Sequence, residues 1–355
     1  MDNTIKFAII GYGRIGKRHA EMVKQNKQSE LVAIADIDES LEEEVKENFS
    51  VPFYNSIEAL LEAYPDIDVV NICTPNGLHA EQALMALSAQ HHVVCEKPMA
   101  LAKADCEAVI SKALHESRHV FSVMQNRYSP PSVWLKSVMD QQLLGRIYQV
   151  QVNCYWNREE EYYTGSTWKG SLEMDGGPLY TQFSHFIDTM FWLFGDIKDI
   201  KARFGKFKEI EGNEFEDTGF IDFEFVDGGV GSFSYSTIIH DKNFESSITI
   251  IGENGTIKVG GQYMEKIEYC HVKDYEQPVL QPSNPPNNYG DYKGSAANHM
   301  YVIQNVVETI NGDSKVTTNA LEGLKVVDII ERMYEQRDLE SLQTALKNSQ
   351  SDLLV

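Results

Sequence analysis

Short apolar runs alternate with helical patterns over the first 124 residues of the chain. Strands are predicted at Lys6–Ile10, Leu31–Ala35, Val69–Cys73, Val93–Cys95 and Val120–Val123. Between them, apolar residues recur with helical spacing, for example over His79–Ala89 and Lys103–Ser117. Strands that are apolar almost throughout and alternate with helices are typical of a parallel sheet covered on both faces. Residues 1–124 are therefore predicted to form an α/β domain with a doubly wound parallel sheet.

The pattern changes after Tyr128-Ser129-Pro130-Pro131, where runs of period two replace the continuous apolar runs. In Gly219–Val226, for example, apolar residues alternate with Asp222 and Glu224. Further strands are predicted at Arg146–Tyr155, Val230–Ile239, Glu245–Ile251 and Thr256–Val259, and helices at Ser132–Gln142, Pro178–Phe194, 296–311 and 319–336. Such alternation indicates an antiparallel sheet with one face against a core. Residues 125–355 are therefore predicted to form an α+β domain with an open, mainly antiparallel sheet.

Composition narrows the choice of partners. The chain of 355 residues is long enough for two domains. Its 31 basic residues against 53 acidic ones give a net charge of −22, which argues against nucleic acid or an anionic membrane as the main partner. No apolar stretch approaches the roughly 18 residues of a membrane span, and the five cysteines show no CxxC spacing. We therefore expect a cytoplasmic protein with free thiols and no bound metal.

A glycine-rich turn joins the first predicted strand to a helix. It reads Gly11-Tyr12-Gly13-Arg14-Ile15-Gly16, the GxGxxG spacing of dinucleotide-binding turns. Gly11 is expected to make the tight turn, Gly13 to let the backbone approach a pyrophosphate, and Gly16 to let helix and strand pack closely. Asp36 follows Gly16 by 20 residues, where a carboxylate binds the ribose hydroxyls and repels a 2′-phosphate. The pattern predicts NAD as cofactor, bound also by Arg14 and Ile15; the alternative for Asp36 is a helix cap.

Two further segments follow strands at the same carboxyl edge of the sheet, where ligands bind in such folds. From Cys73-Thr74-Pro75-Asn76, the residues Thr74, Pro75 and Asn76 are expected beside the cofactor, while His79 either contacts it or belongs to a plain turn. Glu96-Lys97-Pro98 leaves the next strand. A lysine that is partly desolvated beside an oxidised nicotinamide has a lowered pKa, which suits a general base. Glu96 is expected to orient Lys97; the alternative for this tripeptide is a solvated turn.

A polar stripe runs along the predicted helix Pro178–Phe194. Thr181, Gln182, His185 and Asp188 share one face through their i, i+3 and i+4 spacing, on a helix that is otherwise mainly apolar. Such a stripe needs a cavity, a ligand or internal partners. His185 is therefore predicted as a second acid–base residue, with Thr181 and Gln182 in contact with substrate. The alternative is a core histidine hydrogen-bonded to Asp188.

At these residues the chain resembles the glucose–fructose oxidoreductase, inositol dehydrogenase and rhizopine catabolism family. The resemblance covers essentially the whole chain and rests on the glycine motif, Thr74-Pro75, Glu96-Lys97-Pro98 and the Gly176-Gly177…His185 segment. It implies an NAD-binding Rossmann domain and an open α+β domain whose sheet supports a homodimer or homotetramer. It also implies Lys97 and His185 as acid–base residues, a cis bond before Pro98, and Trp168-Lys169 near the cofactor.

Several stretches are similar to one branch of that family, the UDP-N-acetyl-2-amino-2-deoxyglucuronate 3-dehydrogenases of O-antigen sugar synthesis. They are Gln125-Asn126-Arg127-Tyr128, Arg158 through Tyr163, Trp168-Lys169-Gly170, Met174-Asp175-Gly176-Gly177, Gln182…Ser184-His185, Glu216-Asp217-Thr218-Gly219 and Ser247-Ile248-Thr249-Ile250. Position 181 departs from the family pattern. Thr181 stands where polyol dehydrogenases usually have aspartate and the uronate branch tends to have asparagine.

These patterns lead to one leading functional hypothesis and three alternatives. The leading hypothesis is NAD-dependent oxidation of a sugar ring hydroxyl, at C3 of a UDP-linked N-acetyl uronic sugar, with Lys97 as base. Arg127, Arg158 and Lys169 are expected to bind the uronate or diphosphate charge, and Tyr163 the substrate; the alternative for each arginine is a surface salt bridge. The alternative functions are a dehydrogenase of a free sugar or polyol, an NAD-dependent glycosidase and a non-catalytic NAD-binding regulator.

Overall fold

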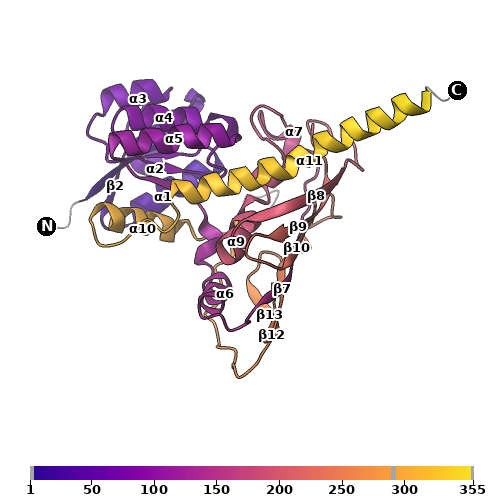
Figure 1. Cartoon of the computed structure of the whole chain (residues 1–355). Helices are drawn as coiled ribbons and strands as arrows, with labels where there is room; N and C mark the ends of the chain where they lie inside the picture. Colours follow the sequence, from indigo (N-terminus) through magenta and orange to yellow (C-terminus); the bar gives the residue numbers. More distant parts are fainter. Residues whose placement is uncertain (1–3, 289–292, 353–355) are drawn as a thin grey trace.

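Two large β-sheets with their helices form the body of the molecule (Figure 1). The computed structural model describes residues 4–288 and 293–352. A third, two-stranded sheet consists of β14 (Pro286–Asn288) and β15 (Lys293–Ala296). Within the described residues, every helix is too short or too polar to span a bilayer.

The first sheet is parallel throughout and has the strand order β3-β2-β1-β4-β5-β6. Its strands are β1 (Ile5–Ile10), β2 (Ser29–Ala35), β3 (Phe53–Tyr54), β4 (Val69–Ile72), β5 (His92–Cys95) and β6 (Val120–Ser122), and the helices between them are α1 (Arg14–Gln25), α2 (Glu42–Phe49), α3 (Ile57–Ala63), α4 (His79–Ser88) and α5 (Lys103–Glu116). The order reverses between β1 and β4, and ligands of such sheets bind at this switch point. The predicted doubly wound sheet is confirmed; β3 was missed because two residues show no apolar run.

The second sheet has the order β13-β12-β11-β7-β10-β9-β8 and is antiparallel except between β7 and β10. Its strands are β7 (Ile147–Tyr155), β8 (Ile197–Gly205), β9 (Thr218–Phe225), β10 (Val230–Ser236), β11 (Glu245–Gly252), β12 (Gly255–Gly260) and β13 (Lys266–Val272). Helix α9 (Ser184–Phe194) packs on the inner face, where the rings of Phe194 and Phe225 lie 5.3 Å apart. The predicted open, mainly antiparallel sheet is confirmed. Its polar edge strands β8 and β13 lacked the period-two signal.

The last helices of the chain return to the parallel sheet. Helix α10 (His299–Ile310) packs its apolar segment Val302–Val307 against Phe7, Val94 and Phe121 of that sheet. Helix α11 (Ala320–Asp352) follows and packs on α5 and β8, so it touches both halves of the molecule. Residues of the predicted second domain therefore complete the core of the first.

The predicted helix Pro178–Phe194 is in fact two helices, α8 (Pro178–Thr181) and α9. The backbone N–H groups of Gln182 and Phe183 both donate to the carbonyl oxygen of Pro178, which ends the regular hydrogen-bond ladder. Phe183 then begins α9, with its carbonyl oxygen accepting from Phe186 and Ile187. The sequence had predicted one continuous helical face for Thr181 and His185. This prediction is wrong, because the break places the two residues on different helices.

A buried ion pair joins three elements near this break. Arg127 lies on the short 3₁₀ helix Gln125–Tyr128, and its guanidinium donates to both carboxylate oxygens of Asp188 on α9, at 2.9 and 2.6 Å. It also pairs with Glu322 of α11. Arg127 is 2% exposed and Asp188 is fully buried. The alternative role of Asp188 as a partner of His185 is therefore wrong, because both of its oxygens bind Arg127.

Replacing Asp188 by asparagine should destabilise the protein strongly. Among the described residues, the substitution leaves the buried guanidinium of Arg127 with Glu322 as its one acidic partner. Breaking a buried ion pair costs about 3–5 kcal/mol of unfolding free energy. Urea denaturation at neutral pH measures the loss. The control is Asp140→Asn on α6 (Pro130–Asp140), where an exposed carboxylate pairs with Lys136 and little change is expected. Equal losses in both variants would contradict the prediction.

Candidate active site

A cavity of about 770 Å³ opens at the carboxyl edge of the parallel sheet. Its walls come from the turns after β1, β2, β4 and β5, and from the segment between β7 and α9. Among the residues singled out from the sequence, those lining it are Gly11, Gly13, Arg14, Ile15, Asp36, Thr74, Pro75, Asn76, His79, Glu96, Lys97, Arg158, Trp168, Lys169, Thr181, Gln182 and His185. Gly16, Arg127 and Tyr163 are not in the lining.

The glycine turn is shaped as its sequence pattern predicts. Gly11 has φ +87°, a conformation that favours glycine, and a Cβ there would lie 2.8 Å from the backbone of Cys73. A Cβ on Gly16 would overlap with the carbonyl oxygen of Gly11. Gly13, at the start of α1, has open space where its side chain would be. The helix N-terminus therefore faces the cavity with unobstructed backbone, which is the arrangement that binds phosphate.

Asp36 lies at the end of β2 with its carboxylate already oriented. Its two oxygens accept from the backbone N–H groups of Tyr12 at 2.6 Å and Asp38 at 2.9 Å. The side chain that caps the following 3₁₀ helix is that of Asp38, which accepts from Ser40. Asp36 is therefore no helix cap, and its carboxylate stands on the cavity wall where a ribose would come.

The turns after β4 and β5 are tied together by His79. One ring nitrogen lies 2.8 Å from the carbonyl oxygen of Thr74 and the other 2.7 Å from that of Pro98. The hydroxyl of Thr74 donates to Gln82 on α4. His79 thus joins the two segments that line the cavity, and it lines the cavity itself. Its contact with a cofactor stays a prediction.

Lys97 places its amine in the cavity at the junction of the two sheets. The Nζ atom donates to the carbonyl oxygen of Thr181 at 2.6 Å, and the peptide bond to Pro98 is cis. Burial lowers the pKa of Lys97 to about 8; the charges of Glu96 and Asp175 oppose this, and those of Arg158 and Lys169 add to it. An amine with such a pKa is partly neutral near physiological pH and can accept a proton. The alternative of a solvated turn does not fit this location.

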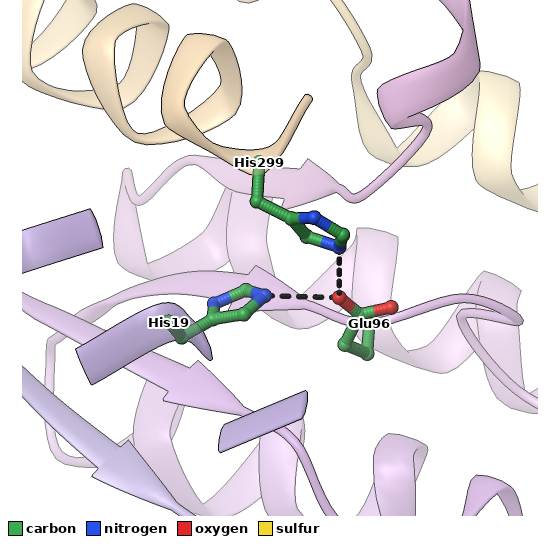
Figure 2. A group of neighbouring side chains, drawn as sticks. All are labelled: His19, Glu96 and His299. Atoms are coloured by element: carbon green, nitrogen blue, oxygen red, sulfur yellow. Dashed lines mark hydrogen bonds and ion pairs between the residues drawn. The ribbon is translucent and has the colours of Figure 1, made fainter. Parts of the chain in front are cut away.

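Two histidines, His19 and His299, hold the carboxylate of Glu96 (Figure 2). One carboxylate oxygen lies 2.9 Å from Nε2 of His19 and 3.4 Å from Nε2 of His299, while the other accepts from the backbone N–H of Lys97. All three side chains are at most 5% exposed. Burial works against ionisation, but the hydrogen bonds from both histidines outweigh it and hold the pKa of Glu96 well below its usual value. Glu96 is thus a fixed buried anion.

The same three side chains are of the types that bind zinc or iron, and their ligand atoms lie within 4.8 Å of one another. The side-chain amide of Asn71 donates to Nδ1 of His19, so Nε2 of His19 carries the proton that it gives to Glu96. A metal bound at Nε2 would have to displace this proton. We therefore interpret the cluster as a hydrogen-bonded anchor for Glu96. His19 and His299 could not be recognised as partners of Glu96 from the sequence, because they lie far apart in the chain and in unremarkable helical patterns.

His185 also lines the cavity and is 3% exposed. The side-chain amide of Gln125 lies 3.2 Å from its Nε2 and also donates to Ser295, so Nε2 accepts and the ring is neutral. Burial lowers the pKa of His185 well below its usual value, and the charge of Lys97 adds to this. Its Nδ1 has no hydrogen-bond partner within the described residues. A neutral imidazole with an unused N–H suits a polar ligand in the cavity.

Two basic side chains and two aromatic rings form another part of the cavity wall, which we call the basic wall. The guanidinium of Arg158 lies 4.8 Å from the ring centre of Trp156 and 5.1 Å from that of Tyr162, and Nζ of Lys169 lies 4.0 Å from Tyr162. All four residues line the cavity. Tyr162 also accepts from the side-chain amide of Gln182. The wall thus combines positive charge with flat apolar surface.

Two predicted substrate contacts are not supported by these positions. Arg127 is wrong as a substrate residue, because its guanidinium is engaged with Asp188 and Glu322 away from the cavity. Tyr163 packs with Tyr162 and Ile210 in a small apolar cluster, and its neighbour Tyr162 lines the cavity instead. The error of one residue arises because both lie on the short helix α7 (Glu160–Thr164), whose orientation the sequence does not reveal.

Comparisons with known proteins agree with this geometry. The GFO/IDH/MocA oxidoreductase family matches the chain twice, with its NAD-binding Rossmann fold over residues 5–124 and its C-terminal alpha/beta domain over residues 136–340. The N-terminal part is thus an NAD-binding Rossmann domain, and the open backbone at Gly13 and the carboxylate of Asp36 fit that cofactor.

Two solved structures are similar over nearly the full chain. The WlbA dehydrogenase from Chromobacterium violaceum, in complex with NADH and UDP-GlcNAcA, is 32% identical; the match covers 95% of each chain with a TM-score of 0.85. The WlbA dehydrogenase from Bordetella pertussis, with the same ligands, is 30% identical over 95% of this chain and 97% of that one, with a TM-score of 0.84. Glucose-6-phosphate 3-dehydrogenase from Bacillus subtilis is 25% identical over 345 residues, which are 93% of this chain and 96% of that protein.

Two glycine substitutions should separate stability from NAD binding. Gly16→Ala forces a methyl group against the Gly11 carbonyl oxygen, and overpacking of this kind costs about 1–3 kcal/mol. Gly13→Ala meets no atom within 4 Å, so thermal unfolding without cofactor should be unchanged while the added methyl group weakens NAD binding. Differential scanning fluorimetry and NAD titration measure the two effects. A Gly13→Ala protein that binds NAD like the wild type would contradict the role given to this turn.

Proposed function

Because the chain belongs to the GFO/IDH/MocA oxidoreductase family, we propose that it is an NAD-dependent dehydrogenase of a nucleotide-linked sugar, oxidising a ring hydroxyl with Lys97 as general base. The observation that carries the proposal is the Lys97 amine, with its pKa of about 8, in a cavity that also holds neutral His185. The proposed reaction site is C3 of a UDP-N-acetyl-hexosaminuronate.

The proposed chemistry needs one proton acceptor and one hydrogen-bonding partner for the same oxygen. The glycine turn at Gly13 and the carboxylate of Asp36 would hold NAD, which would supply the hydride acceptor for the carbinol carbon. Lys97 takes the hydroxyl proton on Nζ, so the alcohol becomes a ketone and the lysine an ammonium group. His185 remains neutral because of its burial and supplies a hydrogen bond to the substrate oxygen. The hydrogen bond from Lys97 to the Thr181 carbonyl oxygen keeps the amine at one place in the cavity.

The choice of a UDP-linked uronic sugar rests on charge and on similarity. Arg158 and Lys169 line the cavity of a chain whose net charge is −22, so positive charge gathers where a ligand binds. Arginine and lysine beside aromatic rings suit a carboxylate or diphosphate together with the flat faces of a base and a sugar. Both WlbA structures were determined with UDP-GlcNAcA.

Exposed Phe220, Ile251 and Tyr269 on the second sheet are in keeping with a proposed homodimer or homotetramer through that sheet.

A second candidate is a dehydrogenase of a smaller sugar or polyol. It is favoured by the similarity to glucose-6-phosphate 3-dehydrogenase and by inositol 2-dehydrogenase from Salmonella typhimurium, which is 30% identical over 207 residues. The same Lys97 and His185 chemistry would serve such a substrate, with Arg158 or Lys169 facing a phosphate.

Substrate turnover tests the proposal directly. NADH formation is followed with UDP-N-acetylglucosaminuronate, its neutral UDP-sugar analogue, glucose 6-phosphate, glucose and inositol. We expect the uronate to have the highest kcat/KM, and Lys97→Met to lower kcat by about 100- to 10,000-fold through loss of the base with NAD affinity retained. The control variant is Lys27→Met, an exposed lysine. Activity confined to glucose and inositol would contradict the UDP-sugar proposal.

The pH dependence of kcat/KM should report the protonation state of the Lys97 amine. A base must be neutral, and the pKa of this amine is about 8, so kcat/KM for oxidation should fall about tenfold per pH unit below that value and level off above it. The Glu96→Gln variant loses the buried anion that raises the pKa of Lys97, so its profile should move to lower pH. A wild-type profile that is flat between pH 6 and 9 would argue against a lysine base.

A further inference from the structure

The carboxylate of Asp175 lies just behind the cavity wall, in the loop before α8. It is 2% exposed and is not among the residues that line the cavity. Its oxygens accept three hydrogen bonds: from the backbone N–H of Gly170 at 2.8 Å, from that of Gly177 at 3.1 Å and from the hydroxyl of Thr181 at 2.6 Å. Every one of these donors is neutral. Burial raises the pKa of Asp175, and these three hydrogen bonds and the charge of Lys169 oppose that rise.

Thr181 connects this carboxylate to Lys97. Its hydroxyl donates to Asp175 and accepts from the side-chain amide of Asn76 at 2.7 Å, so the hydroxyl is already engaged within the protein. Its carbonyl oxygen accepts from Nζ of Lys97 at 2.6 Å. The position of the amine therefore depends on where the Thr181 backbone lies, and the Thr181 side chain is fixed by Asp175.

Asp175 also holds the loop that carries Lys169. Gly170, which donates to it, directly follows Trp168 and Lys169, and both of these residues line the cavity. Gly170 has φ +81° and packs against the backbone of Gly212, which leaves no room for a side chain. A single buried carboxylate thus joins the loop of Lys169 to α8, whose last residue, Thr181, positions Lys97.

We propose that Asp175 is a positioning residue for the dehydrogenase site, fixing the Lys97 amine through Thr181 and placing a buried negative charge close to it. The proposal rests on the proposed role of Lys97 as base. It also explains why a threonine can stand at position 181: the carboxylate comes from Asp175, and the threonine hydroxyl links it to the backbone that holds the lysine.

Several charged or titratable groups face Lys97, and Asp175 acts among them. They are Glu96 on the same turn, Asp175 and Lys169 in the loop before α8, Arg158 after β7, His185 on α9 and His79 on α4. Of these, Glu96 and Asp175 raise the pKa of Lys97, whereas Arg158 and Lys169 lower it. Removing the charge of Asp175 should therefore lower the pKa of the Lys97 amine. Loss of a residue with a purely structural role would not lower it.

Asp175→Asn separates these effects, with Glu173→Gln as the matched control. Glu173 carries the same charge in the same loop but is exposed. Displacement of a reacting group by about 1 Å can cost about 100-fold in rate, so the plateau kcat/KM of D175N should fall by about 10- to 100-fold. The decline of kcat/KM on the acid side of the pH profile should begin at a lower pH in D175N than in the wild type. E173Q should match the wild type in both respects.

Thr181 variants keep the test decisive if D175N does not fold. Thr181→Val removes the hydroxyl that reaches Asp175 but keeps the shape, so the plateau kcat/KM should fall as in D175N while the acid limb stays nearer that of the wild type. Thr181→Ser keeps a hydroxyl at this position, so its kcat/KM should stay close to that of the wild type. A T181V enzyme as active as T181S would overturn the proposal.

A measurement without substrate distinguishes this proposal from the proposed function. The pH dependence of Lys97 acetylation by acetic anhydride, quantified by mass spectrometry, reports the pKa of the amine in each variant. D175N should show a lower midpoint than E173Q, whether or not any sugar is turned over. If no sugar is oxidised, the proposed function fails and the labelling still tests Asp175. Equal midpoints in D175N and E173Q, with equal kcat/KM, would overturn the role of Asp175.

Discussion

One electrostatic constraint underlies the site: an amine must be withdrawn from water and still exchange a proton near neutral pH. Burial alone lowers the pKa of Lys97, and the two carboxylates nearby limit the fall. Each carboxylate is itself buried and has its own hydrogen-bond donors. His19 and His299 donate to Glu96, and the Thr181 hydroxyl donates to Asp175. The behaviour of one lysine thus depends on hydrogen bonds from α1, α8 and α10, so the two halves of the fold must meet for the site to exist.

Features that depend on local order could be predicted from the sequence. Most strands of the parallel sheet are short and largely buried, so they appear as apolar runs. The carboxyl ends of parallel strands meet at one edge by topology. That rule alone places Thr74 and Lys97 on the same cavity. The glycine turn was equally predictable, because the conformation of Gly11 favours glycine and the close approach at Gly16 leaves no room for a side chain.

Features that depend on partners distant in the sequence could not be predicted in this way. Arg127 has the chemistry of a substrate residue, and only the approach of Asp188 and Glu322 in the folded chain shows that its charge is used internally. The break between α8 and α9 depends on one carbonyl oxygen that accepts two hydrogen bonds. Whether Tyr162 or Tyr163 lines the cavity depends on how a five-residue helix is rotated. In each case the residue type was informative and its neighbours decided its role.

The packing of α10 on the parallel sheet has a consequence for how the protein is made. The apolar face that contains Phe7, Val94 and Phe121 is covered by Val302–Val307, which leave the ribosome long after the sheet itself. Until then that face has no cover from α10, and Glu96 lacks His299. The nucleotide-binding half therefore cannot reach its final state during its own synthesis, and the nascent chain must carry an incomplete, apolar sheet until its last helices are added.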